Sequence, residues 1–353
     1  MCAATELHLL EPFWTSPIIY REGLFFIQEA DDQPPVARLL MSPREVLSLR
    51  SATALITYQP DRDYTINAAA QRVELPAGSR VPFRRRRDMY LPPESPMSIP
   101  HRAGDPQQHL YFSEGHVFHH QQAEISYTTD GRWDGFVPRF AGDQLPRTMQ
   151  RLEARDPMQI AVVGDSICAG GNASQDVEPY MPAFPQLVAM GLREVFGSAI
   201  HLTNLAKGGT SAGYGVEVAP QIAQLRPDLT IIAFGMNDVG GPKPEPYARR
   251  IGQIMHIVRE ANPDAEFVLV ATMLANPEWS CTPAQRFAPF RDALATLSGP
   301  GAALADLTSL WADLLQRKNY HDLTGNGVNH ANDFGHRLYA QTILTLMVES
   351  MSG

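Results

Sequence analysis

The chain has 353 residues, enough for two domains or for one large domain with insertions. Hydrophobic residues make up 44% of it and charged residues 19%, which excludes an intrinsically disordered protein. The formal net charge of −9 disfavours a nucleic acid as partner, because nucleic-acid binding needs a cationic surface.

The sequence also lacks the features of a membrane protein or of a cysteine-based framework. It has no run of 18 apolar residues, so we expect no membrane association. Its cysteines, Cys2, Cys168 and Cys281, are odd in number and lack CxxC spacing, which favours neither a disulfide framework nor a zinc site. We expect a cytoplasmic protein, or a secreted one if a leader segment has been removed.

Residues 1–150 are expected to form a β-sandwich domain of jelly-roll type. Short runs rich in β-branched and aromatic residues alternate there with turns rich in Pro, Gly and Asp, a spacing typical of such folds. The runs are residues 23–28, 53–58, 109–113 and 123–129. One short helix is expected after Ser42.

Residues 151–353 show a different pattern, in which apolar runs of strand length alternate with amphipathic helices. This alternation predicts an α/β domain with a parallel sheet covered on both faces. The expected strands are residues 159–163, 200–205, 229–234, 267–272 and 302–307. Helical periodicity appears at residues 184–195, 251–258 and 334–346. We place the domain boundary between residues 145 and 157.

Four polar motifs lie next to these elements, where ligands bind in open parallel sheets. Three follow strands: GDSI with Ser166, AKGG with Gly209, and GMND with Asn237. The fourth, GVNHAN with His330, precedes the last helix. A Ser, a Gly, an Asn and a His at these places, in this order, resemble the SGNH hydrolases, also called GDSL esterases and lipases. The resemblance covers about residues 158–348.

The resemblance implies a three-layer α/β domain that hydrolyses esters without a cofactor. Ser166 would be the nucleophile and His330 the general base that takes its proton. The oxyanion hole would consist of the Ser166 and Gly209 backbone N–H groups and the Asn237 side-chain amide. The resemblance also leads us to expect that Asp165 braces the loop and that His336 has a structural role.

The third member of the catalytic triad departs from the family pattern. The family usually has an aspartate three residues before the histidine, and this chain has Gly327 there. Asp333 is the only carboxylate within three residues of His330, and we take it as the acid. The alternatives are Asn326, a backbone carbonyl, or the more distant Asp322.

Two further clusters are not expected to carry chemistry. His116, His119 and His120 have the spacing HxxHH, but in a strand the last two would point to opposite faces, so we expect no metal site. The arginine run at residues 84–87 is expected to be a solvated edge. The motifs GxSxG, GxxxxGK[ST] and HExxH are absent from the sequence.

An SGNH domain preceded by a β-sandwich is similar to carbohydrate O-acetylesterases. The resemblance implies a serine ester hydrolase that removes acetyl groups from a small-molecule or oligosaccharide substrate through an acyl-enzyme. One alternative is a short-chain acyl esterase or lysophospholipase. Another is a non-catalytic glycan-binding protein with a decayed hydrolase domain. The sugar, the ester position and the oligomeric state stay open.

Overall fold

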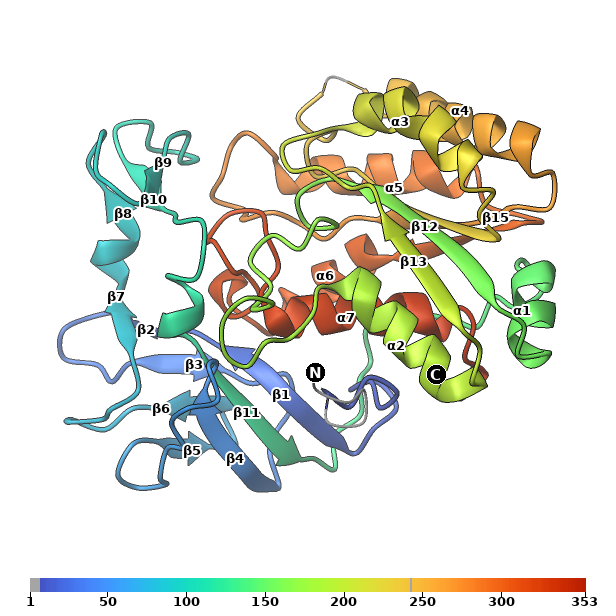
Figure 1. Cartoon of the computed structure of the whole chain (residues 1–353). Coiled ribbons are helices and arrows are strands. Elements are labelled where there is room, and N and C mark those ends of the chain that lie inside the picture. Colours follow the sequence, from blue (N-terminus) through green and yellow to red (C-terminus); the bar gives the residue numbers. More distant parts are fainter. Residues whose placement is uncertain (1–6, 242) are drawn as a thin grey trace.

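The apolar runs of the C-terminal part form one five-stranded parallel sheet (Figure 1). The structure is a computed structural model that describes residues 7–241 and 243–353. From one edge to the other, the strands are β13 (Ile200–Asn204), β12 (Met158–Gly164), β14 (Leu229–Ala233), β15 (Glu266–Ala271) and β16 (Ala302–Asp306). Residues of β14 and β15 are buried throughout, as expected for strands covered on both faces. All five predicted strands are confirmed.

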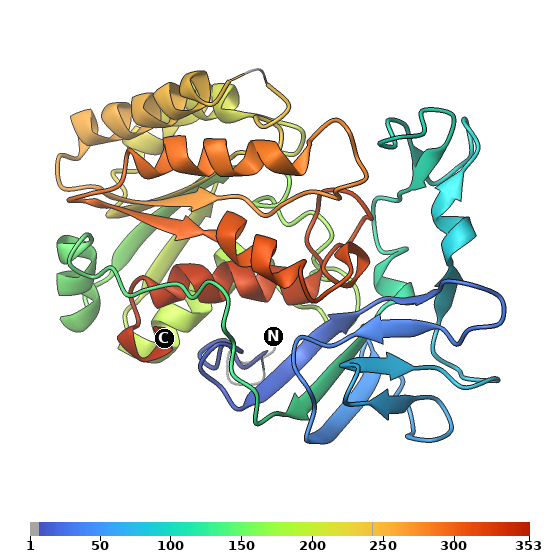
Figure 2. The same ribbon diagram turned by 180° about the vertical axis from the view of Figure 1, so that it is seen from behind.

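Helices cover both faces of this sheet and make the domain three-layered (Figures 1 and 2). One face carries α2 (Phe184–Phe196) and α7 (Asp333–Thr345), and the other α3 (Ala212–Gln224), α4 (Glu245–Ala261) and α5 (Phe287–Ala295). Two short helices are α1 (Pro146–Glu153) and α6 (Leu307–Leu314). Within the described residues, none of the helices has the length and apolar character that crossing a membrane requires.

The N-terminal part is rich in β-strands, most of them paired antiparallel. One sheet has the order β1 (Ile18–Leu24), β11 (Ala123–Thr128), β4 (Glu45–Ser51). A second has the order β5 (Thr65–Asn67), β6 (Arg72–Glu74), β3 (Val36–Arg38), β2 (Phe26–Gln28), β7 (Phe83–Arg85). The third, which we call the arm, has the order β8 (Tyr90–Leu91), β10 (His109–Tyr111), β9 (Ser98–Ile99). The expectation of a β-rich domain ahead of the α/β domain is confirmed.

Short 3-10 helices complete the chain at Arg86–Met89, His119–Gln121, Ala284–Arg286, Tyr320–Asp322 and Glu349–Met351.

Two local predictions for the β-rich domain were wrong. The helix expected after Ser42 is strand β4, which pairs with β11 along its length. Leu49 in β4 is buried while Leu47 is 49% exposed, so the true period there is two residues, and pairing with β11 overrides helix propensity. The run at 53–58 forms a turn and an isolated bridge between Arg50 and Thr57.

Helix α7 is buried on all sides, which fixes how the two parts fit together. All its residues from Asp333 to Thr345 are buried. It contacts α2 and β16 within the α/β domain and β1 of the β-rich domain. Its Arg337 donates hydrogen bonds to the backbone oxygens of Tyr20 and Arg21, and burial lowers the pKa of this guanidinium to about 9. The two domains therefore enclose the helix that follows His330.

A buried ion pair joins the two domains beside α7. Lys318 of the α/β domain and Glu22 of β1 both have fully buried side chains and contact each other through Nζ and Oε1. Glu22 also accepts hydrogen bonds from the Tyr127 hydroxyl at 2.7 Å and the Leu40 backbone N–H at 3.0 Å. Lys318 Nζ also lies 3.7 Å from the buried Asp322 carboxylate, so it is the cation that two buried carboxylates share. The pair is tolerated in the interior because of these contacts, and removing the lysine is costly.

We predict that Lys318→Met lowers the free energy of unfolding by about 3–5 kcal/mol, because it leaves the Glu22 carboxylate buried without its cation. Denaturant unfolding of the full chain measures this. Adding Glu22→Gln to the variant should recover part of the loss, and Lys243→Met, at an exposed lysine, serves as the control. A loss below about 1 kcal/mol for Lys318→Met would contradict the account.

Candidate active site

Ser166 lies in the turn directly after β12, at the carboxyl edge of the parallel sheet. The neighbouring Asp165 is buried and accepts a hydrogen bond from the Ile167 N–H at 3.1 Å. The Asp165 backbone N–H donates to the Ala233 carbonyl of β14 at 3.3 Å. Burial raises the pKa of the Asp165 carboxyl to about 7. Asp165 thus braces the turn that presents the serine.

The structure brings Ser166 and His330 together. His330 Nε2 lies 2.7 Å from Ser166 Oγ. On the other side of the ring, Nδ1 lies 2.6 Å from Asn172 Oδ1 and 3.4 Å from Glu114 Oε2. Asn172 belongs to the loop after β12, whereas Glu114 follows β10 in the β-rich domain. The imidazole therefore lies between the serine and two oxygen atoms that come from different domains.

Asn172 is held in one orientation, and this fixes the tautomer of His330. Its Nδ2 donates to the backbone oxygens of Gly115 at 2.6 Å and Gly325 at 3.1 Å, so its Oδ1 faces the ring. Because an amide oxygen only accepts, Nδ1 of His330 carries the proton and Nε2 is left to accept from Ser166. The Asn172 backbone is left-handed, with φ of +63°, which asparagine tolerates better than most residues.

The expected acid, Asp333, does not contact the imidazole. Both of its oxygens accept hydrogen bonds from Ser174, one from the backbone N–H at 2.9 Å and one from Oγ at 2.6 Å. Asp333 is in the first turn of α7, where a carboxylate also interacts favourably with the helix dipole. The structure thus corrects this expectation: Asp333 holds the loop after β12 against the start of α7.

The two alternative side chains, Asn326 and Asp322, are also engaged elsewhere. The Asn326 side-chain oxygen accepts three backbone N–H groups, including that of His330 at 3.1 Å, and so shapes the loop rather than orienting the ring. Asp322 accepts from the Phe25 N–H at 2.7 Å and the Asn319 N–H at 3.0 Å. Within the part of the chain that the structure describes, Asn172 and Glu114 are the side chains that contact Nδ1.

The turns that carry Gly209 and Asn237 are joined at the same edge of the sheet. Asn237 Nδ2 donates to the Thr210 backbone oxygen at 2.8 Å. A Cβ at Gly208 would lie 3.8 Å from the Ser166 Cβ, which places the turn after β13 beside the serine. Gly209 has φ of +73° and faces open space, so a side chain there would meet no neighbour but would strain the backbone.

His336 is structural, as expected. It is fully buried in α7; its Nδ1 accepts from the Phe184 N–H at 3.4 Å and its Nε2 lies 3.2 Å from the Gly171 backbone oxygen. Burial lowers the pKa of His336 to about 4, so the ring is neutral at physiological pH. It ties the start of α2 to the loop behind Ser166.

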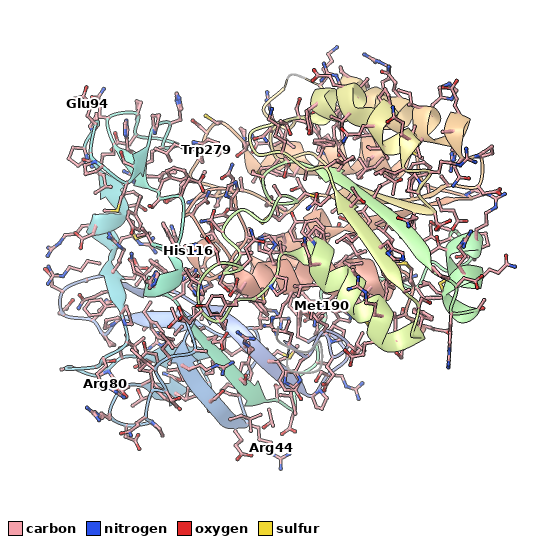
Figure 3. All side chains as sticks on the ribbon, viewed as in Figure 1. Arg44, Arg80, Glu94, His116, Met190 and Trp279 are labelled. Atoms are coloured by element: carbon pink, nitrogen blue, oxygen red, sulfur yellow. The ribbon has the colours of Figure 1, made fainter. Side chains whose placement is uncertain are left out.

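Two of the three histidines of the HxxHH motif fasten the β-rich domain to the loop after β12. His116 Nε2 lies 3.0 Å from Asp176 Oδ1, and His119 Nε2 lies 2.7 Å from the Glu178 backbone oxygen. Figure 3 places His116 where the two domains meet. Among the residues that the structure describes, no three His, Cys, Asp or Glu side chains lie together in an arrangement suited to a metal ion.

The arginine run makes ion pairs at the surface of the β-rich domain. Arg86 pairs with Glu29 at 2.7 Å and Arg87 with Asp31 at 3.1 Å. These are exposed or partly exposed pairs, which contribute little to stability.

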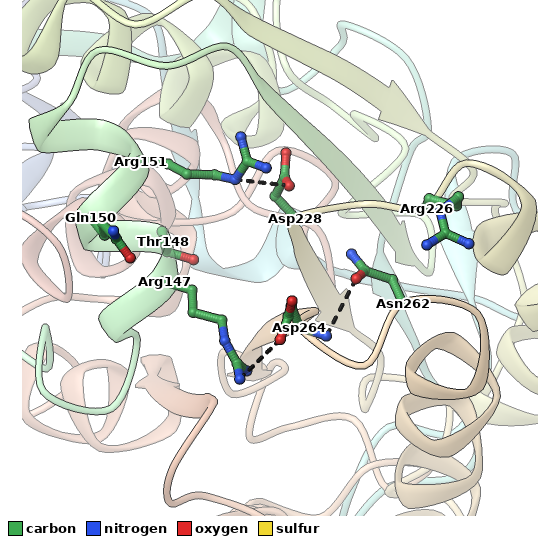
Figure 4. A pocket seen from close by; sticks show the side chains of 8 residues that line it. All are labelled: Arg147, Thr148, Gln150, Arg151, Arg226, Asp228, Asn262 and Asp264. Atoms are coloured by element: carbon green, nitrogen blue, oxygen red, sulfur yellow. Dashed lines mark hydrogen bonds and ion pairs between the residues drawn. The ribbon is translucent and has the colours of Figure 1, made fainter.

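A cavity of about 420 Å³ lies at the opposite edge of the parallel sheet (Figure 4). Two of its lining residues, Asp228 and Asp264, precede β14 and β15, so it lies at the amino ends of the strands. Four of its charged side chains pair with each other, Arg151 with Asp228 at 3.1 Å and Arg147 with Asp264 at 2.9 Å. It is remote from Ser166, which lies at the carboxyl ends of the strands.

Sequence reasoning missed Asn172 and Glu114. Asn172 is 158 residues from His330, and Glu114 lies in a part of the chain to which the family motifs do not extend. Tertiary packing brings both side chains to the ring, and for Glu114 this is the packing of the two domains against each other. In the sequence, the only sign of Asn172 is that a polar residue follows closely after the serine motif, and this is a weak indication of a role at the site.

A sequence model of the GDSL-like Lipase/Acylhydrolase family matches residues 162–338, which is half of the chain. The match includes Ser166, Gly209, Asn237 and His330. A comparison with curated proteins gives no match.

Solved structures with a similar fold are esterases and lipases. A two-domain esterase (CEX) active on acetylated mannans is 22% identical with a TM-score of 0.49; the match covers 62% of this chain and 56% of that chain. The lipase Lip_vut3 from a goat rumen metagenome is 15% identical with a TM-score of 0.43, over 53% of this chain and 96% of that chain. A lipolytic protein of the G-D-S-L family from Veillonella parvula is 16% identical with a TM-score of 0.43 and the same coverage. The chain thus spans little more than half the length of CEX.

The raised pKa of Asp165 predicts a pH-dependent stability. With a pKa of about 7 when folded, the carboxyl keeps a proton that the unfolded chain releases near pH 4, so the wild type loses stability as pH rises from about 4 to 7. Asp165→Asn cannot lose this proton. Its Tm relative to the wild type should therefore rise by about 3 °C or more between pH 4.5 and pH 8.

Thermal melts across that range measure the difference, with Asp32→Asn, at an exposed aspartate, as the control. A Tm difference for Asp165→Asn that stays constant with pH would show that the carboxyl is already ionised at low pH.

Proposed function

This chain belongs to the GDSL-like lipase/acylhydrolase family, and on that premise we propose that it is a serine ester hydrolase that removes O-acetyl groups from a carbohydrate. The observation that carries the hydrolase part is the 2.7 Å contact between Ser166 Oγ and His330 Nε2. It provides a nucleophile within hydrogen-bond reach of a base whose tautomer leaves Nε2 free to accept.

The first chemical step is attack of Ser166 Oγ on the ester carbonyl. As the C–O bond forms, the hydroxyl proton passes to His330 Nε2, and the ring becomes an imidazolium with N–H groups on both nitrogens. Nδ1 keeps its hydrogen bond to Asn172 throughout. The imidazolium then donates its Nε2 proton to the departing alcohol, which leaves an acyl group on Ser166. Water, activated by the same nitrogen, releases the acid.

The oxyanion formed during attack is assigned to the donors around the serine. These are the backbone N–H groups of Ser166 and Gly209 and the side-chain amide of Asn237. One N–H of Asn237 Nδ2 is used on the Thr210 carbonyl, which fixes the amide, and the second N–H is available to the oxyanion. Loss of one such donor typically costs about 2.7–4 kcal/mol of transition-state stabilisation.

The surface around the site supports a small acyl group on a polar alcohol. Large apolar side chains that are strongly exposed occur at several places in the described residues, but none is in the turns that carry Ser166, Gly209, Asn237 or His330. Asn237 itself is exposed and polar. A long acyl chain needs apolar surface, and these turns do not offer it. A sugar hydroxyl and an acetyl group do not need such surface.

We predict that Ser166→Ala loses at least about three orders of magnitude in kcat on p-nitrophenyl acetate, because no other group takes over as nucleophile. A fluorophosphonate probe should label the wild type and leave this variant unlabelled. Thermal melts check that the variant is folded. If the folded variant retained more than a tenth of wild-type turnover, Ser166 would not be the nucleophile.

The acyl preference separates the proposed esterase from a lipase. Across p-nitrophenyl esters from acetate to decanoate, kcat/KM should be highest for acetate and fall with chain length. A maximum at octanoate or beyond would instead indicate a lipase or lysophospholipase. Release of acetate from acetylated polysaccharides and oligosaccharides then tests the carbohydrate part. Binding to such glycans with neither turnover nor probe labelling would indicate a non-catalytic protein.

A further inference from the structure

We infer that Glu114 of the β-rich domain is the positioning acid of this active site, and that it shares with Asn172 the work that a single aspartate does in a Ser-His-Asp triad. Asn172 orients the imidazole, and Glu114 supplies the negative charge that stabilises the imidazolium. This inference rests on the proposed ester hydrolysis, and it makes the β-rich domain part of the catalytic site.

The first support comes from Gly327, where the packing of the β-rich domain leaves no room for a side chain. A Cβ at Gly327 would lie 2.6 Å from the Tyr111 backbone oxygen and 2.6 Å from Cζ of Phe118, both in the β-rich domain. Gly327 also has φ of +90°, which disfavours other residues. The docked β-rich domain thus fills the space that an aspartate side chain three residues before His330 would need.

The same docking delivers a carboxylate to the ring. Tyr111 ends β10, and Glu114 follows three residues later. Its Oε2 lies 3.4 Å from His330 Nδ1, and its Oε1 accepts a hydrogen bond from Asn326 Nδ2 at 3.4 Å. The segment that excludes an aspartate at position 327 therefore brings its own acid to Nδ1.

Asn172 alone cannot do both parts of the work. Its amide oxygen fixes the tautomer but carries no net charge, so it stabilises an imidazolium less than a carboxylate does. Glu114 provides that charge without displacing the amide. The β-rich domain also holds the amide itself, through the hydrogen bond from Asn172 Nδ2 to the Gly115 carbonyl at 2.6 Å.

Glu114 is the charged neighbour of His330 at mildly acidic pH. The other titratable groups that interact electrostatically with the ring are Asp165 from the turn after β12 and His336 from α7. Burial raises the pKa of Asp165 to about 7 and lowers that of His336 to about 4, so both are largely neutral near pH 5.5. Burial raises the pKa of Glu114, but its contacts with His330 and Asn326 outweigh this and leave the pKa below its usual range.

The test is Glu114→Gln, which keeps the shape of the side chain and removes its charge. We expect kcat/KM on p-nitrophenyl acetate to fall about 10- to 100-fold, mostly through kcat, since Glu114 acts through His330. The loss should be smaller than the roughly 10⁴-fold cost of replacing a triad aspartate by asparagine, because Asn172 preserves the tautomer. The acidic limb of the pH–kcat/KM profile should move to lower pH by about half a unit or more.

The matched control is Glu94→Gln, at an exposed glutamate near the tip of the arm, which Figure 3 shows well away from His116. It should match the wild type in activity and pH profile. Both variants should melt within about 2 °C of the wild type, since the Glu114 side chain is 58% exposed. If Glu114→Gln behaved like Glu94→Gln, or lost activity through KM with an unmoved acidic limb, the inference would be wrong.

A measurement that does not depend on ester hydrolysis separates this inference from the proposed function. The ring signals of His330 can be followed by NMR against pH in the Ser166→Ala background, with and without Glu114→Gln. The titration midpoint should drop by about half a pH unit or more when the Glu114 charge is removed, whether or not esters are hydrolysed. An unchanged midpoint would refute the role of Glu114 even in an active esterase.

Discussion

The burial of the loop before α7 beneath the β-rich domain is the constraint on which the site depends. Residues 320–328 are all buried, so their polar groups need partners within the protein. The β-rich domain supplies several of them: the Phe25 N–H donates to Asp322, and Gln122 Nε2 donates to the backbone oxygens of His321 and Thr324. Together with the Lys318–Glu22 ion pair, these contacts set the path of the loop that presents His330.

It follows that the two domains form one functional unit. The described apolar core runs without a break from residues of β1 and β11 to α7 and the parallel sheet. The indole N–H of Trp14, near the start of the described chain, donates to the Met351 carbonyl close to its end. A displacement of the β-rich domain would expose α7 and release the loop of His330, so stability and catalytic geometry are coupled through the same contacts.

The sequence was most informative where local pattern and chemistry coincide. Buried parallel strands appear as continuous apolar runs, and Ser166, Gly209, Asn237 and His330 follow strands or precede a helix in a fixed order. It failed where distant segments compete for the same space. Asp333 is the carboxylate nearest to His330 in sequence, but both of its oxygens accept hydrogen bonds from Ser174. The partners of Nδ1 come from loops that only tertiary packing brings together. Pairing with β11 likewise turned the expected helix after Ser42 into β4.

The central claim is that one site is built from both domains around His330. A crystal structure of the full chain with a phosphonate inhibitor bonded to Ser166 tests it most directly, because the adduct resembles the tetrahedral intermediate. The account predicts a phosphonyl oxygen within hydrogen-bond distance of the Ser166 and Gly209 N–H groups and Asn237 Nδ2. It also predicts that His330 Nδ1 stays between Asn172 Oδ1 and the Glu114 carboxylate. An adduct structure with Glu114 turned into solvent and another acid at Nδ1 would contradict the account.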